Sequence, residues 1–515
     1  MKIKLPNYST ISLILTFFVI CSVAYSQEKA YAEKIDDFIE KVNEMFPDVP
    51  ALGVAIVKND KPILVEGYGY ADLKNKKEAD KNTSFYIAST TKSFIGILAT
   101  LLEHEGLLDL SAPLTNYKPF KTLSNKEVFE KTTIAELLNH TSGLTNNFIT
   151  FRNSYLGNLS QKDAIMLLDN ATQIGEKKFE YSNIGYNLLS ILLKEEFGKD
   201  WRNLLDEKLF VPLQMNHTSA YISKAIKEKW MLAKPYIAQE EKGPKEYSHK
   251  TDNTMHAAGG LISSASDAAK WLLYNINQGS VGEKQISASQ VLEKAHKPSV
   301  KYIKEKGQIF QGYSYGMGWH NGTFKDKNKV IYHFGGYNGF QSHISFMPEE
   351  KIGIAIFTNE EHFGDNVGSI IASYAYEVLL DENPNEEIYE QKLDHLDGFQ
   401  LKLVENFSKN KEKESHFEWR LTKSLQAFTG KFYNKYMGII RIRKKDDALY
   451  IRFGELEAKA KASPEINSMR VELIPNRPMT LSFKVDDTHH TIKEINSGGL
   501  TFKRIEIKEI QSQKN

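Results

Sequence analysis

The feature that most limits the fold is a pair of strand-forming segments that lie far apart in the chain. The first is a hairpin over residues 52–65, and the second covers residues 342–357. Between them, from about residue 107 to residue 255, the hydrophobic pattern is mainly helical. Strand segments separated by a long helical block predict a mixed α/β or α+β fold.

A second set of short strands ends the chain. Six to eight strands in about 90 residues predict a small antiparallel barrel or sandwich. The charged stretch at 385–425 comes before them and predicts a domain boundary. The segments that alternate between apolar and polar residues are 430–433, 438–443, 448–453, 469–474, 479–485, 491–495 and 500–505.

Residues 1–26 have the pattern of a secretory leader. Lys2 and Lys4 give a positive start, residues 11–24 are apolar but too few to span a bilayer, and small residues precede Gln27. An uncleaved anchor is the alternative. We therefore expect a periplasmic or secreted protein with no stable membrane span after cleavage.

The single cysteine and the charge balance exclude several classes of function. Cys21 lies in the leader, and bulky Ile20 before it argues against a lipoprotein. Cleavage would leave no thiol for disulfides, nucleophilic catalysis or metal binding. The 66 basic and 65 acidic residues nearly cancel, so no charge pattern indicates nucleic acid or an anionic membrane. We expect a small-molecule or peptide substrate, no metal and no cofactor; the oligomeric state stays open.

The first candidate catalytic stretch is Ser89-Thr90-Thr91-Lys92. It lies where a strand-like run gives way to a helical one, so Ser89 and Lys92 share one face of a helix N-terminus. A serine beside an amine and free backbone N–H groups can carry out acyl transfer. Chance also supplies this spacing, at 26–29 and 408–411, and a helix cap beside a solvated lysine is the alternative.

Further candidates follow along the chain. Tyr181 is the only one of the 25 tyrosines with an asparagine two positions later, and in an extended segment Tyr181 and Asn183 would point to one side. A half-buried aromatic and an asparagine turn are the alternative. His140 lies in an Asn-His-Thr-Ser-Gly turn, where we interpret it as structural. A third block, 333–336, contains a glycine pair that would let a ligand or another backbone approach closely.

Together these motifs resemble those of the serine β-lactamase and penicillin-binding-protein superfamily, and especially its class C β-lactamase-like hydrolases. That branch also holds D-alanyl-D-alanine carboxypeptidases, D-aminopeptidases and esterases. The motifs occur in the family's order, and residues 138–144 and 258–261 are similar to the family too. The resemblance covers roughly residues 30–380. It implies an antiparallel sheet flanked by helices, with a helical insert.

The expected domains are a leader at 1–26, a β-lactamase-like serine hydrolase at 27–395, and a linker with a small antiparallel β-barrel at 396–515. The C-terminal strands resemble the lipocalin-like domain often found after this catalytic domain. We interpret it as a stabilising or lid-forming accessory, and a separate ligand-binding cavity is the alternative.

The resemblance also implies roles for the site residues. Ser89 would be acylated, Lys92 would accept its proton, and Tyr181 would relay a proton to the leaving group. Asn183 would hold a substrate amide. The backbone N–H groups of Ser89 and Gly336 would form the oxyanion hole.

The third motif, His333-Phe334-Gly335, departs from the usual Lys-Thr-Gly or Lys-Ser-Gly. His333 and Gly335 would border the substrate, but the permanent cation and the hydroxyl for a substrate carboxylate are missing. This argues against an efficient β-lactamase or a strict carboxypeptidase and favours a peptidase or esterase. The alternative is a penicillin-binding or sensor protein that acylates slowly with little turnover. The physiological substrate stays open.

Overall fold

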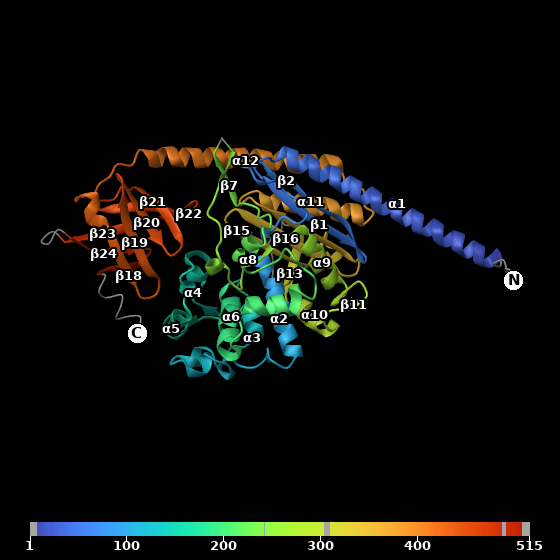
Figure 1. Cartoon of the computed structure of the whole chain (residues 1–515), viewed down its shortest axis with the longest axis horizontal. Coiled ribbons are helices and arrows are strands. Elements are labelled where there is room, and N and C mark those ends of the chain that lie inside the picture. The colour runs from blue at the N-terminus through green and yellow to red at the C-terminus, as the bar shows by residue number, and fades with distance from the viewer. Residues whose placement is uncertain (1–7, 241–242, 303–308, 487–490, 507–515) are drawn as a thin grey trace.

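In the computed structural model, which describes residues 8–240, 243–302, 309–486 and 491–506, the chain forms two parts. The larger part surrounds one large sheet, and the smaller one is a β-barrel at the C-terminal end (Figure 1). The long helix α12 (Glu386–Ser415) runs from the larger part to the barrel. It continues across the boundary that the sequence places between residues 395 and 396.

The large sheet joins the two strand sets that are far apart in the sequence. All its neighbouring strands pair antiparallel, and β1 lies beside both β2 and β17. In sheet order the strands are β12 (Val300–Lys301), β13 (Phe310–Tyr315), β14 (His320–Phe324), β15 (Asn328–Tyr337), β16 (Phe340–Met347), β17 (Ile352–Thr358), β1 (Ala51–Lys58), β2 (Lys61–Asp72) and β3 (Lys77–Glu78).

Side chains of β1 show how the sheet divides two hydrophobic cores. Leu52, Val54 and Ile56 pack with helices α1 and α11 on one face. Ala55 and Val57 face the other core, which contains α2 and α9. Because successive residues of a strand point to opposite faces, a continuous apolar strand fits only a sheet that is covered on both sides. The predicted mixed fold with an antiparallel sheet is confirmed.

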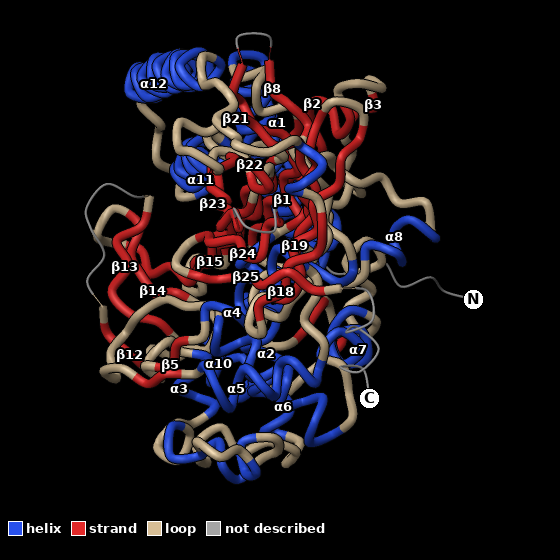
Figure 2. Tube along the Cα trace, turned by 90° about the vertical axis from the view of Figure 1, so that its left-hand side faces the viewer, coloured by secondary structure: helices blue, strands red, loops and turns tan. Residues whose placement is uncertain are grey.

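Most helices of the segment between β4 and β9 gather away from α1 and α12 (Figure 2). The helices are α1 (Tyr8–Met45), α2 (Thr91–His104), α3 (Ile134–Leu138), α4 (Asn147–Phe151), α5 (Gln161–Ala171), α6 (Ile184–Phe197), α7 (Trp201–Leu205), α8 (Ile222–Lys227), α9 (Ala265–Ile276), α10 (Ser289–His296), α11 (Gly364–Leu379) and α12. Four two-stranded sheets connect them: β4 (Phe85–Tyr86) with β9 (Ile262–Ser263), β5 (Leu144–Thr145) with β6 (Gln173–Ile174), β7 (Tyr236–Glu240) with β8 (Gly243–Glu246), and β10 (Ser280–Val281) with β11 (Lys284–Gln285).

Helix α1 unites two segments that the sequence treats separately. The apolar part of the expected leader and residues 30–45 of the expected hydrolase domain lie in one helix, which ends at Met45, before Pro47. Lys2 and Lys4 fall outside the described residues. Within the described part of the chain, no helix is both long enough and apolar enough to cross a bilayer.

The C-terminal strands close into a barrel, as predicted. One strand, β21, is absent from the predicted set. The barrel strands are β18 (Gly430–Asn434), β19 (Gly438–Lys445), β20 (Ala448–Phe453), β21 (Leu456–Ala462), β22 (Ser468–Ile474), β23 (Arg477–Asp486), β24 (Thr491–Ser497) and β25 (Leu500–Ile505).

The barrel docks on the helical region through turns between its strands. Leu156, from the π-helical turn η5 (Arg152–Leu156), lies in the barrel's own core. Its carbonyl oxygen accepts a hydrogen bond of 2.9 Å from the Glu455 backbone N–H. Arg152 donates to Tyr436 O at 3.2 Å. The barrel therefore shares its core with the larger part.

Candidate active site

Ser89 lies at the junction between a short strand and a buried helix. After β4 comes the 3₁₀ turn η1 (Ala88–Thr90), and α2 begins at Thr91. Residues Thr91–Leu102 of α2 are buried, so the helix is fixed in the core. The half-exposed Ser89 sits at its N-terminal end, where free N–H groups favour negative charge. The predicted strand-to-helix transition is confirmed.

Lys92 is fully buried, and its amine lies beside the serine. Its Nζ is 3.0 Å from Ser89 Oγ and donates to Ala258 O at 2.7 Å. Burial lowers the pKa of the Lys92 amine well below its ordinary value, because surroundings of low dielectric disfavour the charged form. A neutral amine at this distance can accept the proton of the serine hydroxyl.

The backbone just before Ser89 is strained. Ala88 has a φ of 44°, a left-handed conformation that costs a non-glycine residue about 1–2 kcal/mol. Hydrogen bonds on both sides of Ile87 hold this turn: its N–H donates to Leu261 O at 2.9 Å, and its carbonyl accepts from Ser342 Oγ at 2.7 Å. Strain that is held in place this way is typical of functional sites.

Strand β15 approaches Ser89 so closely that only glycine fits. A Cβ on Gly335 would lie 2.3 Å from Ile87 O and 2.9 Å from Ser89 N. Because φ of Gly335 is not in the left-handed region, glycine is required for space and not for its conformation. The third motif and the first are thus in direct contact.

The N–H of Gly336 points away from the neighbouring strand β16. Tyr337 and Phe340 close the β15–β16 hairpin, and Gly336 pairs with Gln341. The closing pair of a two-residue hairpin exchanges hydrogen bonds and the next pair does not. On the opposite side, β14 pairs with β15 only as far as Tyr332. Neither neighbouring strand therefore uses this N–H in the ladder.

Tyr181 lies between the nucleophile and a buried histidine. Tyr181 is 42% exposed as a whole, but burial of its hydroxyl end raises the pKa of the phenol above the ordinary value, an effect partly offset by a hydrogen bond with the Ser89 side chain. Its ring centroid lies 4.8 Å from Lys92 Nζ and 4.5 Å from that of His140. A phenol that stays protonated beside the serine can pass a proton without carrying charge.

His140 is buried and holds the Tyr181 loop from behind. Its Nδ1 accepts from the Ser182 backbone N–H at 3.2 Å. Burial lowers the pKa of His140 well below its ordinary value, and positive charge on Lys92 or His333 would lower it further. The neutral ring fits the predicted structural role.

Asn183 presents a free acceptor. It is the N-cap residue of α6, with φ −79° and ψ −17°, so the segment is not extended through Asn183 as the sequence suggests. Its buried Oδ1 has no hydrogen-bond partner among the residues that the structure describes. This oxygen can accept a hydrogen bond from a substrate N–H.

His333 is held on both sides by the protein. It is only 1% exposed. Its Nδ1 is 2.7 Å from Phe334 O, a carbonyl that can only accept, so Nδ1 carries the hydrogen. In the neutral ring Nε2 then accepts from the Tyr315 hydroxyl at 3.1 Å. This geometry favours a role for His333 in placing strand β15.

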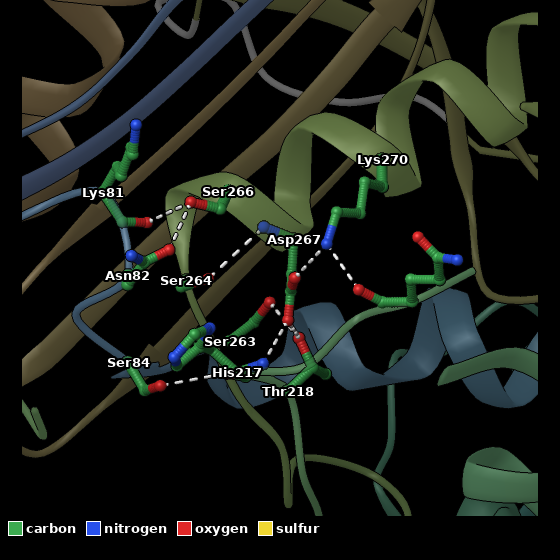
Figure 3. A network of polar contacts seen from close by, with 11 residues as sticks. Lys81, Asn82, Ser84, His217, Thr218, Ser263, Ser264, Ser266, Asp267 and Lys270 are labelled. Atoms are coloured by element: carbon green, nitrogen blue, oxygen red, sulfur yellow. Dashed lines mark hydrogen bonds and ion pairs between the residues drawn. The ribbon is translucent and has the colours of Figure 1, made fainter. Parts of the chain in front are cut away.

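A buried polar network fixes the β4–β9 pair that leads into Ser89 (Figure 3). Asp267, at the start of α9, accepts from the His217 backbone N–H at 2.7 Å and from Thr218 Oγ1 at 2.9 Å. Ser266 Oγ donates to Lys81 O at 2.9 Å. Because the Asp267 carboxylate is fully buried, these donors and the Lys270 amine at 3.0 Å satisfy a charge that burial alone would disfavour.

Sequence reasoning missed the partners of the motif residues. The Ala258 carbonyl, Tyr186 near the Lys92 amine, and Tyr315 beside His333 carry no local signal. Only the Ala258-Gly259-Gly260-Leu261 stretch pointed to this region. No group of three histidine, cysteine, aspartate or glutamate side chains placed for a metal occurs in the described part of the chain.

The model of the family described as Beta-lactamase matches residues 36–373. Protein flp of Staphylococcus aureus (strain COL) is 28% identical over 322 residues, which are 60% of this chain. The chain spans about 60% of the length of that relative.

Two solved structures share the fold. The octameric penicillin-binding protein homologue from Pyrococcus abyssi has a TM-score of 0.57 and 22% identity, over 91% of this chain and 99% of that one. The D-amino acid amidase from Ochrobactrum anthropi SV3, in complex with D-phenylalanine, has a TM-score of 0.55 and 22% identity, over 68% and 99% of the two chains.

Proposed function

The chain belongs to the Beta-lactamase family, and from this premise we propose that it is a serine hydrolase that cleaves amide or ester bonds through an acyl-enzyme on Ser89. The observation that carries the proposal is the buried amine of Lys92 at 3.0 Å from Ser89 Oγ. A helix cap beside a solvated lysine would not need a lysine that is 0% exposed.

Each residue of the site lies where it can carry out one step of acyl transfer. Ser89 Oγ attacks the acyl carbon as Lys92 Nζ takes its proton. The oxyanion that forms accepts hydrogen bonds from the N–H groups of Ser89 and Gly336. The Tyr181 phenol passes a proton to the leaving group, and Lys92 and Tyr181 then activate the water that releases the acyl group.

For the substrate, we propose a neutral ester or amide in preference to a carboxylate-bearing β-lactam. The position of the usual lysine is occupied by His333, whose Nδ1 donates to Phe334 O, so no permanent cation stands there. Asn183 Oδ1 would accept the N–H of a peptide-like acyl group. The fold shared with a D-amino acid amidase makes amino-acid amides a suitable first panel.

The function is tested with an activated ester and a fluorophosphonate probe for active-site serines. We expect wild-type protein to turn over the ester and to be labelled at Ser89, and Ser89→Ala to lose both. The matched control is Ser408→Ala in helix α12, since Ser408 and Lys411 have the same spacing. Slow labelling at Ser89 without turnover would favour the slow-acylating sensor, and labelling of Ser89→Ala would refute the nucleophile.

The place of action is part of the proposal. We propose that the protein is exported and acts in the periplasm or outside the cell, on the basis of the charged and apolar pattern of residues 1–26. N-terminal sequencing of protein from the native host would show cleavage before Gln27 or an intact leader.

A further inference from the structure

Lys250 is a second buried lysine, and it has no role in the steps proposed above. It lies between β8 and the 3₁₀ turn η7 (Asp252–Thr254). Its Nζ donates to Ser154 O at 2.5 Å and to Thr254 O at 3.3 Å. No carboxylate among the described residues lies within ion-pair distance of this amine. Carbonyl oxygens and aromatic rings are its nearest surroundings, and the charge of Glu455 acts on it from farther away.

Three tyrosine rings surround the Lys250 amine. Nζ lies 3.6 Å from the ring centroid of Tyr337, 5.2 Å from that of Tyr86 and 5.8 Å from that of Tyr155. The rings also contact one another: Tyr86 is 5.3 Å from Tyr337, and Tyr155 is 5.4 Å from Tyr337. The Tyr337 hydroxyl donates to Ser154 O at 3.4 Å, so it shares an acceptor with Lys250.

Two of these rings belong to the segments that supply the oxyanion donors. Tyr337 directly follows Gly336 at the end of β15. Tyr86 is the last residue of β4, three positions before Ser89, and its hydroxyl donates to Gly259 O. A side chain that lies beside both rings is therefore placed to act on the separation of the Ser89 and Gly336 N–H groups.

Stability alone does not account for a lysine at this position. Burial lowers the pKa of the Lys250 amine well below its ordinary value, which means that the surroundings disfavour its ammonium form. A buried amine without a carboxylate partner costs folding free energy that an apolar side chain of similar length would not. The carbonyl oxygens and the Tyr337 ring offset part of that cost.

We propose that Lys250 is a positioning residue for the oxyanion hole: it holds Tyr337 and Tyr86 together and so sets the spacing of the Gly336 and Ser89 N–H groups. It touches neither the substrate nor the reacting atoms. This inference rests on the proposed function, because it concerns the acyl-transfer step of that same site.

The test compares Lys250→Met with Lys58→Met, because both lysines contact a carbonyl oxygen and a tyrosine ring. Lys58 Nζ donates to Leu379 O at 2.6 Å and lies 4.6 Å from the Tyr31 ring centroid, and burial lowers its pKa as well. It lies at the far end of β1, away from Ser89. Lys58 is only partly buried. Lys58→Met therefore removes an amine with the same kinds of contact, from a more exposed position and without any link to the oxyanion segments.

The readouts are kcat, KM and the midpoint of thermal unfolding, together with the affinity for a boronic acid that mimics the tetrahedral adduct on Ser89. We expect Lys250→Met to lower kcat by at least about tenfold, with KM within about twofold, and to weaken boronic acid binding to a similar degree. Its unfolding midpoint should equal or exceed that of the wild type. Lys58→Met should leave kcat unchanged.

A second variant tests whether Lys250 acts on kcat through the Tyr337 ring. Tyr337→Leu should cause a loss in kcat like that of Lys250→Met, and the double variant should be no worse than either, because both act on one contact. An unchanged kcat in Lys250→Met would overturn the proposal, as would a kcat that falls only together with the unfolding midpoint. Failure of the wild type to hydrolyse esters would instead contradict the proposed function.

Discussion

Replacing Gly335 by alanine tests the contact between strand β15 and the nucleophile. The added Cβ would meet Ile87 O at 2.3 Å, Ser342 Oγ at 2.5 Å and Ser89 N at 2.9 Å. Two of these atoms belong to the backbone, so no side-chain rotation relieves the clash. The strand and the turn that carries Ser89 must move apart.

The size of the effect follows from these distances. Ordinary contacts of a Cβ begin at about 3.4 Å, so β15 must withdraw from Ile87 O by roughly 1 Å. A misplacement of this size can lower the rate by about 10²-fold, or some 2.7 kcal/mol in the activation free energy. Overpacking of this kind also destabilises the fold by about 1–3 kcal/mol.

The assay is turnover of an activated ester alongside thermal unfolding. Gly368→Ala in helix α11 is the control, because its Cβ would meet only the Ile356 side chain, at 3.6 Å or more. We expect Gly335→Ala to lose about two orders of magnitude in kcat at a temperature where it is folded, and Gly368→Ala to keep the wild-type rate. A Gly335→Ala enzyme with a kcat within threefold of the wild type would refute the close approach of β15 to Ser89.

Three further outcomes are expected. Lys92→Arg keeps a cation but cannot supply a neutral base, so labelling by a serine probe should fall nearly as far as in Ser89→Ala; normal labelling would place the base elsewhere. Tyr181→Phe keeps the ring against His140 but removes the proton relay, so kcat for an amide should fall by about 10²–10⁴-fold, with folding unchanged by circular dichroism. Burial lowers the pKa of both His296 and His343 to about 3. Both are protonated more readily when unfolded, so stability should be full above about pH 6.5 and decline as pH falls towards 3. Urea unfolding across that range would show the decline, and His343→Gln should reduce its slope.

The sequence predicts best those parts of the site that depend on local geometry. Ser89 and Lys92 are three residues apart at a helix N-terminus, so helix geometry alone brings them together. The third motif and Ser89 lie some 250 residues apart in the chain, and the sequence joined them in one site only through the family resemblance. The contact of Gly335 with the Ser89 turn was not predicted. The partners of Lys92 and His333, Ala258 O and Tyr315, could not be predicted because tertiary packing alone places them.

In the barrel, strand β21 was missed for a compositional reason. Residues 456–462 read Leu-Glu-Ala-Lys-Ala-Lys-Ala, and alanine and lysine are depleted in strands. Its neighbours β20 and β22 supply the pairing that its own side chains do not favour. Closure of the barrel, and not local propensity, makes this segment a strand.

The pairing of β1 with β17 determines when the active site can exist during synthesis. Leu52 pairs with Thr358, so the middle of the sheet is incomplete until the ribosome has added roughly 300 residues after β1, which takes about 15–60 s at ordinary elongation rates. Until then Ser89 has been made but strand β15 has no finished sheet to hold it beside the serine. A nascent chain therefore carries the nucleophile well before it can carry an oxyanion hole, and hydrolytic activity should first appear only after β17 has left the exit tunnel.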